Sequence, residues 1–197
     1  MLGGQRAEPR REGAASRDPD AALLDRIGAK DLKAFETLYR AYHPRLTRFL
    51  MQMLRSPQLV EEVLNDTLLL VWRQPERYNG RSKVSTWIFA IAYRKGLKAL
   101  RRRDEPVEDP EAEQRASPDE GPEQQLGRRQ AREALVGAMG ELSADHRAVV
   151  DLTYFHEFGY REIAELMDCP IDTVKTRMFH ARRRLKTKLA GKLADWL

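Results

Sequence analysis

Hydrophobic residues recur at helical intervals over two long stretches of the chain. In residues 21–103 no segment alternates as a strand would, and breaks at His43-Pro44, at Ser56-Pro57 and in the loop QPERYNGRSK predict about four helices. The same spacing recurs in residues 129–197, over the segments QAREALVGAMGEL, SADHRAVVDLTYFHEF, YREIAELMD and TVKTRMFHARRRLKTKL. The chain is therefore expected to be all-α, with two small helical domains. The i, i+3, i+4, i+7 spacing is clearest at Phe35, Leu38, Tyr39 and Tyr42.

The stretch between these two domains cannot form a core of its own. Residues 104–125 hold nine acidic side chains, four prolines and one basic residue, Arg115. Like charges and prolines keep such a chain extended, so an acidic flexible linker is predicted at residues 104–128. The first 20 residues, MLGGQRAEPRREGAASRDPD, lack the apolar segment of a signal peptide, and a disordered tail is expected there.

Charge is distributed unevenly along the chain. The formal net charge is only +5, yet residues 94–103 and 174–192 carry six and eight basic residues with no acid, whereas residues 132–172 carry nine acids and three bases. Concentrated basic segments indicate a polyanionic partner more strongly than the total does. With 42% hydrophobic and 33% charged residues, packed cores beneath an ionic surface are expected.

Cysteine content and hydropathy indicate the cellular compartment that the protein suits. The single cysteine, Cys169, can form neither an intramolecular disulfide nor a cysteine-rich zinc site, which suits a reducing cytoplasm. No apolar run approaches the ~18 residues that span a bilayer. A soluble, cytoplasmic protein without direct membrane insertion is therefore predicted.

The segment YREIAELMDCPIDTVKTRM has the pattern of a helix-turn-helix. The turn is predicted at residues 168–170, where Asp168 takes the left-handed position that glycine often holds. Asp172 is expected to be the N-cap of the second helix, and Thr173 its first residue.

The two faces of that second helix differ in chemistry. At about 100° per residue, an apolar stripe separates from an outward face that includes Phe179 among basic residues. On an isolated basic helix, Phe179 would be expected to pack on a neighbouring element, but the preceding turn and cap favour insertion into a DNA major groove. The predicted apolar stripe is Val174, Met178, Ala181, Leu185 and Leu189, and the outward residues are Thr176, Phe179, His180 and Arg183.

Aromatic and basic residues alternate in the segment RYNGRSKVSTWIFAIAYRK of the first domain. Such interleaving suits unstacked, single-stranded bases. For Trp87 alone, a role in the core is an equally good interpretation. A buried role does not explain the polar run at residues 78–82, which carries the stronger signal.

Together, four segments of the chain resemble the extracytoplasmic-function (ECF, group IV) sigma factors of bacterial RNA polymerase. They are AFETLYRAYHPRLTRFL, LVEEVLNDTLLLVWR, VSTWIFAIAYRKGLKALRRR and LSADHRAVVDLTYFHEFGYREIAELMDCPIDTVKTRMFHARRRL. The resemblance implies sigma region 2 at residues 21–103 and sigma region 4 at residues 129–197. The sequence departs from the family at Asp168 and Asp172, where glycine is frequent, and at Val84, where an aromatic residue is frequent.

The resemblance also implies partners: core RNA polymerase, through its largest-subunit coiled coil and its flap, promoter DNA, and an anti-sigma factor. Polymerase contacts would be Glu62, Asn65, Asp66 and Trp72. The −35 contacts would be Thr173, Lys175, Thr176, Arg177, Phe179, His180, Arg182 and Arg183. The −10 contacts and the melting of DNA would involve Tyr78, Asn79, Gly80, Arg81, Ser82, Lys83, Trp87, Arg94 and Lys95.

Nothing in the sequence indicates catalysis or a cofactor. The four histidines are dispersed, and no HExxH, P-loop, GxSxG or Cys/His metal pattern occurs. His146 and His156 flank Asp151 and Glu157, which could suggest a metal pair, but a solvated or capping role is expected instead. The alternative function is a helix-turn-helix transcription regulator that acts without core polymerase.

Overall fold

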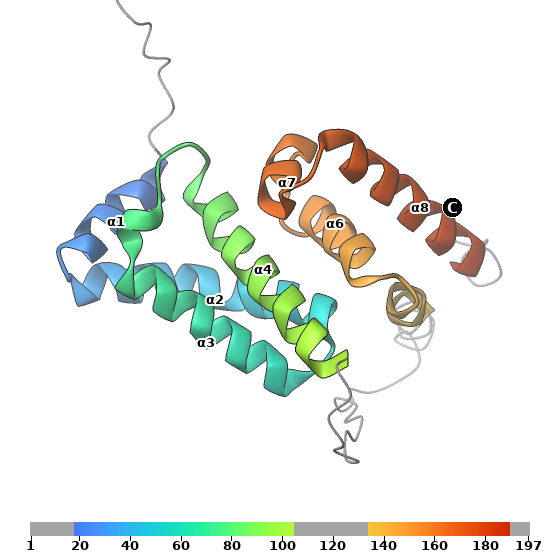
Figure 1. The fold of residues 1–197 in the computed structure, drawn as a ribbon, viewed down its shortest axis with the longest axis horizontal. Helices are drawn as coiled ribbons and strands as arrows, with labels where there is room; N and C mark the ends of the chain where they lie inside the picture. Colours follow the sequence, from blue (N-terminus) through green and yellow to red (C-terminus); the bar gives the residue numbers. More distant parts are fainter. Residues whose placement is uncertain (1–17, 105–133, 190–197) are drawn as a thin grey trace, which may run out of the picture.

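The computed structural model describes residues 18–104 and 134–189, and every regular element in these ranges is helical. Figure 1 shows two helical groups lying side by side, α1–α4 and α6–α8. The all-α prediction is confirmed. The elements are α1 (Pro19–Gly28), α2 (Leu32–Leu54), α3 (Pro57–Arg73), a 3₁₀ turn η1 (Pro75–Arg77), α4 (Val84–Asp104), helical residues 134–140, α6 (Ala144–Tyr154), α7 (Tyr160–Met167) and α8 (Ile171–Leu189).

The long helix α2 is the centre of the first group and packs against α1, α3 and α4. The predicted break at Pro44 is wrong, because α2 continues through it. Proline removes one N–H bond, but the buried stripe that includes Leu38, Leu46 and Phe49 runs along α2 on both sides of Pro44 and outweighs that local cost. The break lies instead at residues 29–31, where Lys30 has a φ of 63°.

The other two predicted breaks in this group are confirmed. Ser56 caps α3 by accepting a hydrogen bond from the Leu59 amide, and Pro57 occupies the first turn. The loop QPERYNGRSK separates α3 from α4 and contains only the short turn η1.

Asp18 ties the start of α1 to the start of α4. Its Oδ1 accepts from the Asp20 amide at 3.1 Å and its Oδ2 from the Val84 amide at 2.7 Å, so one carboxylate caps two helix beginnings. Because α1 begins at Pro19, helical structure starts two residues before the predicted start of the first domain. The rest of the predicted tail and nearly all of the predicted linker lie outside the described residues, and the domain boundaries stay a prediction.

In the second group, α7 and α8 form the helix-turn-helix. Asp168 is left-handed (φ 51°, ψ 54°) as predicted, and the next amide, of Cys169, donates to the Ala164 carbonyl at 3.0 Å. The predicted N-cap is wrong: the carbonyl of Pro170 accepts the first helical bonds, so α8 begins at Ile171, a half-buried residue packed on the core. Asp172 therefore lies inside the first turn of α8.

The two groups also pack on each other, α6 against α2 and α7 against α4. Their buried side chains form one continuous hydrophobic cluster. Two helical domains joined by a linker were predicted, and the structure brings them into direct contact.

Candidate nucleic-acid interface

Helix α8 presents the two faces that its sequence predicts. Val174 and Ala181 are completely buried and Met178 nearly so, whereas Thr176 and His180 are exposed. The Phe179 side chain is 62% exposed, so the alternative in which it packs on a neighbouring element is wrong. An aromatic ring left in water beside an imidazole and a hydroxyl is a surface suited to base edges and thymine methyl groups.

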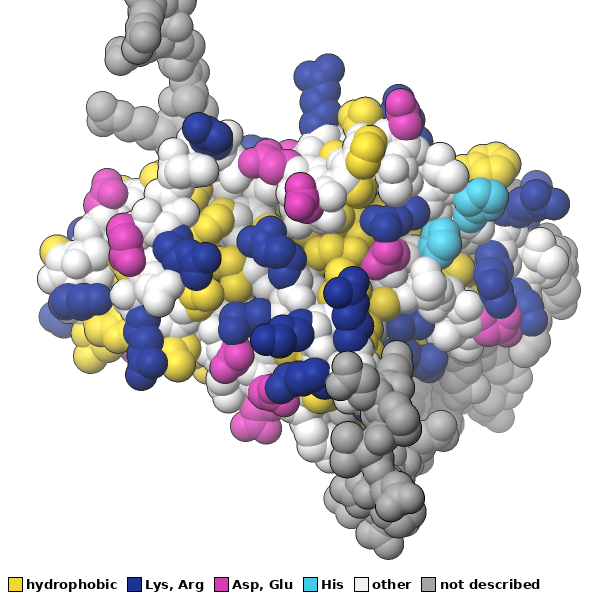
Figure 2. Space-filling view, in the orientation of Figure 1, with side chains coloured by type: hydrophobic (Ala, Val, Ile, Leu, Met, Phe, Trp, Pro, Cys, Tyr) yellow, Lys and Arg dark blue, Asp and Glu magenta, His cyan; other side chains and the backbone are white. Residues whose placement is uncertain are grey.

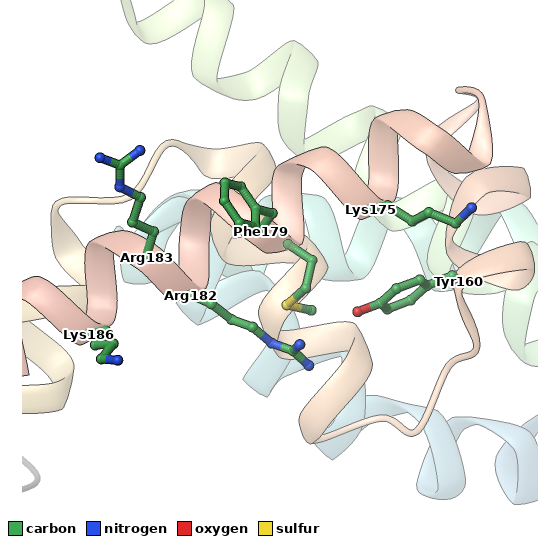
Figure 3. A pocket seen from close by; sticks show the side chains of 7 residues that line it. Tyr160, Lys175, Phe179, Arg182, Arg183 and Lys186 are labelled. Atoms are coloured by element: carbon green, nitrogen blue, oxygen red, sulfur yellow. The ribbon is translucent and has the colours of Figure 1, made fainter.

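Side chains from α7 and α8 line an open hollow of about 350 Å³ beside Phe179 (Figure 3). Arg182 extends along one side, where its Nε donates to the Tyr154 hydroxyl at 3.0 Å. Met178 is an apolar part of the lining, and the cationic side chains around it are of the kind that contacts DNA phosphates. Its lining residues are Tyr160, Lys175, Met178, Phe179, Arg182, Arg183 and Lys186.

The predicted −35 set did not include Tyr160 and Lys186, which line this hollow. Lys186 follows Arg182 and Arg183 at helical spacing, so a helical projection extended by one turn would have included it. Tyr160 is the first residue of α7, and only the crossing of α7 over α8 brings it beside Lys175.

Two predicted −35 cations are paired with acids in the structure. Lys175 contacts Asp172 at 2.9 Å on the surface of α8. The Arg177 guanidinium contacts Asp145 of α6 at 2.5 Å, and only 24% of its side chain is exposed. Arg182 and Arg183 are exposed, and Thr173 is half-buried. The accessible part of the predicted −35 set therefore lies toward the middle of α8.

The loop before α4 is held in a defined shape. The Tyr78 hydroxyl donates to the Ser82 carbonyl at 2.6 Å, the Arg81 amide donates to Asn79 Oδ1 at 3.0 Å, and Gly80 has a φ of +70°. These bonds leave Asn79, Gly80 and Arg81 exposed. Burial, followed by the nearby acids Asp18 and Glu165, raises the pKa of Tyr78. A base entering the loop would meet a surface that is already formed.

Trp87 combines both interpretations left open by the sequence. It is half-buried and packs on the Tyr78 ring with centroids 5.5 Å apart, so it supports the loop while part of its surface stays accessible. Arg94 is exposed on α4, and Lys95 reaches back to Asp66 of α3 at 2.8 Å. Figure 2 shows basic side chains gathered over the face along which α4 runs.

Three of the four predicted polymerase contacts lie on the solvent-exposed face of α3. Asn65 and Asp66 are exposed, as their positions in an apolar helix required. Glu62 pairs with Arg102 at 2.6 Å, so both acids of this set bind basic residues of α4. Trp72 is half-buried with its ring 5.1 Å from that of Phe35.

The histidines form no metal site: within the described ranges no group of three or more potential metal ligands occurs. His146 lies in the first turn of α6 with its Nδ1 2.6 Å from the hydroxyl of Ser143, so it contacts the capping residue, which is Ser143 itself. His156 is neither solvated nor a cap, because its side chain is only 3% exposed and its Nε2 lies 3.1 Å from a fully buried Asp151 carboxylate. That approach has the distance of an ion pair without the alignment of a hydrogen bond.

Two family models match the chain, one in each helical group. Sigma-70 region 2 matches residues 38–105 and sigma-70 region 4 matches residues 132–185, together more than half of the chain. The chain is 28% identical over 180 residues to an ECF RNA polymerase sigma-E factor of Haemophilus influenzae, which covers 86% of this chain and 95% of the relative. It is 26% identical over 190 residues to the RNA polymerase sigma-H factor of Pseudomonas aeruginosa, at 91% and 98% coverage.

The chain belongs to the sigma-70 family, as an ECF sigma factor. Solved structures show the same fold. The structure of CnrH in complex with the cytosolic domain of CnrY has a TM-score of 0.65 at 19% identity, covering 87% of this chain and 97% of that one. The sigma factor RpoE in complex with the anti-sigma factor NepR from Bartonella quintana has a TM-score of 0.61 at 24% identity, covering 80% and 98%.

The match places α3, the loop of residues 74–83 and all of α4 within region 2 of the sigma factor, and α6, α7 and most of α8 within region 4. Helix α1 precedes the matched range, although Asp18 at its start anchors α4. Among the helices of the described ranges, none has both the length and the apolar character that crossing a bilayer requires.

Proposed function

We propose that this sigma factor directs core RNA polymerase to promoters by reading the −35 element as duplex and the −10 element as an unpaired strand. The observation that carries the proposal is the presence of two differently built surfaces in one chain. Helix α8 exposes Phe179 on a helix-turn-helix, and a pre-shaped polar loop lies beside the half-buried Trp87. A regulator that only bound duplex DNA would have no use for the second surface.

In region 4, Thr176, Phe179 and His180 would contact base edges, because they are the exposed uncharged side chains in the first half of α8. The cations along α8 would neutralise phosphates and fix the register on the duplex. Each specific base contact contributes about 1–3 kcal/mol of discrimination. Phosphate-directed residues are Thr173, Lys175, Arg177, Arg182 and Arg183, to which the hollow adds Lys186.

In region 2, the loop would hold a base that leaves the stack. Extruding a base costs a few kcal/mol, and stacking on an aromatic ring returns about 1–3 kcal/mol per base. Asn79 and Arg81 offer exposed polar groups next to the Tyr78–Trp87 ring pair. Melting is then driven by binding of the separated strand, with Arg94 and Lys95 of α4 beside its backbone, and the protein catalyses no reaction of its own.

The polymerase contact is proposed on α3. Glu62, Asn65 and Asp66 form an exposed polar edge, and Trp72 lies two turns beyond Asn65 on the same side of α3. They would dock on the largest-subunit coiled coil, while region 4 meets the flap. An anti-sigma factor is proposed as a further partner, since RpoE, a structural relative, is found with the anti-sigma factor NepR. With these partners the protein would act in the cytoplasm.

The test is transcription from a linear promoter fragment with purified protein and core polymerase. Specific initiation is expected, and Asn79→Ala should reduce strand opening, seen as permanganate reactivity at −10, while leaving polymerase binding intact. Arg73→Ala, which alters another exposed residue of region 2 outside the loop, is the matched control. If the protein binds promoter duplex alone but never associates with core polymerase, the alternative of a free helix-turn-helix regulator replaces the proposal.

A further inference from the structure

The first turn of α4 takes a hydrogen-bond acceptor from a distant part of the chain. The Lys83 carbonyl accepts a bond from the Trp87 amide at 3.1 Å, so Lys83 stands in the N-cap position of α4. A lysine side chain only donates hydrogen bonds, and it cannot satisfy the free amides of the turn that follows. The Val84 amide donates instead to Asp18 Oδ2 at 2.7 Å, across 66 positions of the chain. The start of α4 is therefore held by the residue that precedes α1.

Helix α1 keeps the Asp18 carboxylate in this place. Leu24 and Ile27 of α1 are buried in the hydrophobic core. The Tyr42 hydroxyl of α2 donates to Asp20, and Asp18 Oδ1 caps α1 itself by accepting from the Asp20 amide at 3.1 Å. Because these contacts already fix the carboxylate, it loses little further conformational entropy when it binds the Val84 amide.

Helix α1 contacts both ends of the loop that precedes α4. At the entry, α1 packs against η1, with Gly28 facing the Pro75 ring (Figure 1). At the exit, Asp18 holds the Val84 amide. These two points set the span that residues 78–83 have to close, so the shape of the loop depends on α1 as well as on the bonds within the loop.

The charge of Asp18 is also felt in the loop. Burial first, and then the charge of Asp18, raise the pKa of Tyr78. The hydrogen bond and charge of Glu162 raise the pKa of Lys83, and the charge of Asp18 adds to this. A carboxylate repels the phosphates of a DNA strand, whereas it interacts favourably with the positive end of a helix dipole. The position of Asp18 is therefore explained by its bond to α4 and not by a contact with DNA.

We propose that Asp18 is a positioning residue for capture of the −10 strand, although it precedes the range that matches region 2. Its bond to Val84 fixes the first turn of α4, and Trp87 at the end of that turn packs on the Tyr78 ring with centroids 5.5 Å apart. Without the bond, the turn and the ring pair shift relative to Asn79. The proposal rests on the proposed function for what the loop captures.

The test separates the two hydrogen bonds that Asp18 accepts. Asp18→Ser leaves a good N-cap for α1, but its single oxygen lies closer to the backbone and cannot also accept from the Val84 amide. Asp18→Ala removes both bonds. The matched control is Asp31→Ser, which replaces the N-cap of α2 and changes the net charge equally. Asp31 accepts from two amides of α2 and from Arg26, away from the loop.

The full-length variants are compared in hydrogen exchange at the Val84 amide, in urea unfolding, and in permanganate reactivity at −10 with core polymerase. We expect faster exchange and about fivefold lower reactivity in both Asp18 variants, as the loss of one hydrogen bond predicts. Binding of core polymerase and of a −35 duplex should stay within about a factor of two of wild type. The urea midpoint should be unchanged in Asp18→Ser and lower in Asp18→Ala, and Asp31→Ser should leave exchange and reactivity unchanged.

Wild-type permanganate reactivity in Asp18→Ser would overturn the positioning role. A loss in Asp18→Ala alone would assign the effect to the cap of α1, and an equal loss in Asp31→Ser would assign it to helix capping in general, so either result also rejects the proposal. The comparison with Asn79→Ala separates this failure from that of the proposed function. If Asn79→Ala lowers reactivity and Asp18→Ser does not, only the positioning role fails, and if neither does, the loop captures no strand and both fail.

Discussion

Removing the ring of Phe179 should weaken recognition of the −35 DNA while leaving the stability of the fold almost unchanged. The side chain is 62% exposed and its nearest aromatic neighbour is the His180 ring, with centroids 5.5 Å apart. Phe179→Ala should therefore change the free energy of unfolding by no more than about 0.5 kcal/mol. If the ring contacts bases, the affinity of the polymerase-bound protein for a −35 duplex should fall by about 1.4 kcal/mol, which is tenfold.

Val174→Ala is the control on the same helix, and it should reduce stability because its side chain is buried. Val174 is completely buried. Losing two methyl groups costs about 1.6 kcal/mol by transfer at ~0.8 kcal/mol each, and the cavity raises this to about 2 kcal/mol. Urea unfolding followed by circular dichroism should show this loss for Val174→Ala and none for Phe179→Ala. Fluorescence anisotropy with consensus and scrambled −35 duplexes, each with core polymerase, measures recognition.

The salt dependence of DNA binding tests whether Phe179 contacts bases rather than phosphates. Because Phe179 carries no charge, its removal should leave the slope of log affinity against log salt unchanged while narrowing the gap between consensus and scrambled duplexes. A loss of stability of 2 kcal/mol or more in Phe179→Ala would show that the ring is packed. Unchanged discrimination between the duplexes would show that it reads no base.

Three further predictions concern single residues. Pro44→Ala restores an amide that can bond within α2 and should raise the free energy of unfolding by up to about 3 kcal/mol, measured in urea. Gly80→Ala meets no atom within 4 Å but forces an L-residue to φ +70°, so it should cost about 1 kcal/mol and reduce permanganate reactivity at −10 more than −35 binding. Burial first, and then the charge of Arg177, lowers the pKa of His146 below 6.5 in the folded protein. The contribution of neutral His146 to the free energy of unfolding is therefore complete above pH 6.5 and is lost as the pH falls through the lowered pKa. Thermal unfolding between pH 7.5 and 5 should show this loss in the wild type and less of it in His146→Gln.

The features that the sequence predicted correctly are those fixed within one helix or turn. Val174, Met178 and Ala181 lie on one side of α8 because residues three and four apart share a face. Asp168 could be assigned to the left-handed turn because short polar side chains tolerate that conformation. Local geometry alone decides such positions, so no tertiary information was needed.

Where local signals were wrong, packing had overridden them. A proline predicted the end of a helix at Pro44, but the apolar stripe on both sides kept α2 intact. Asp172 is a good N-cap residue, yet α8 begins at Ile171, whose side chain packs on the core. In each case a preference of about 1–3 kcal/mol yielded to burial of neighbouring side chains.

His156 shows why the contact between the regions could not be predicted. Its neighbours in sequence are exposed or polar. Its burial arises only because the rings of Phe49 and Phe89, which precede it by 107 and 67 residues in the chain, lie beside it. Periodicity reports the face of a helix but not the element that covers that face.

The uneven charge of region 4 gave a partial indication that the two regions would touch. Residues 132–172 carry nine acids against three bases, and from the sequence this indicated only that their surface differs in charge from that of α8. In the structure two of these acids, Asp145 and Glu162, face Tyr93 and Lys83 of region 2. A basic surface and an acidic surface in one chain are complementary to each other, so the charge that marks the predicted −10 loop also favours its contact with region 4.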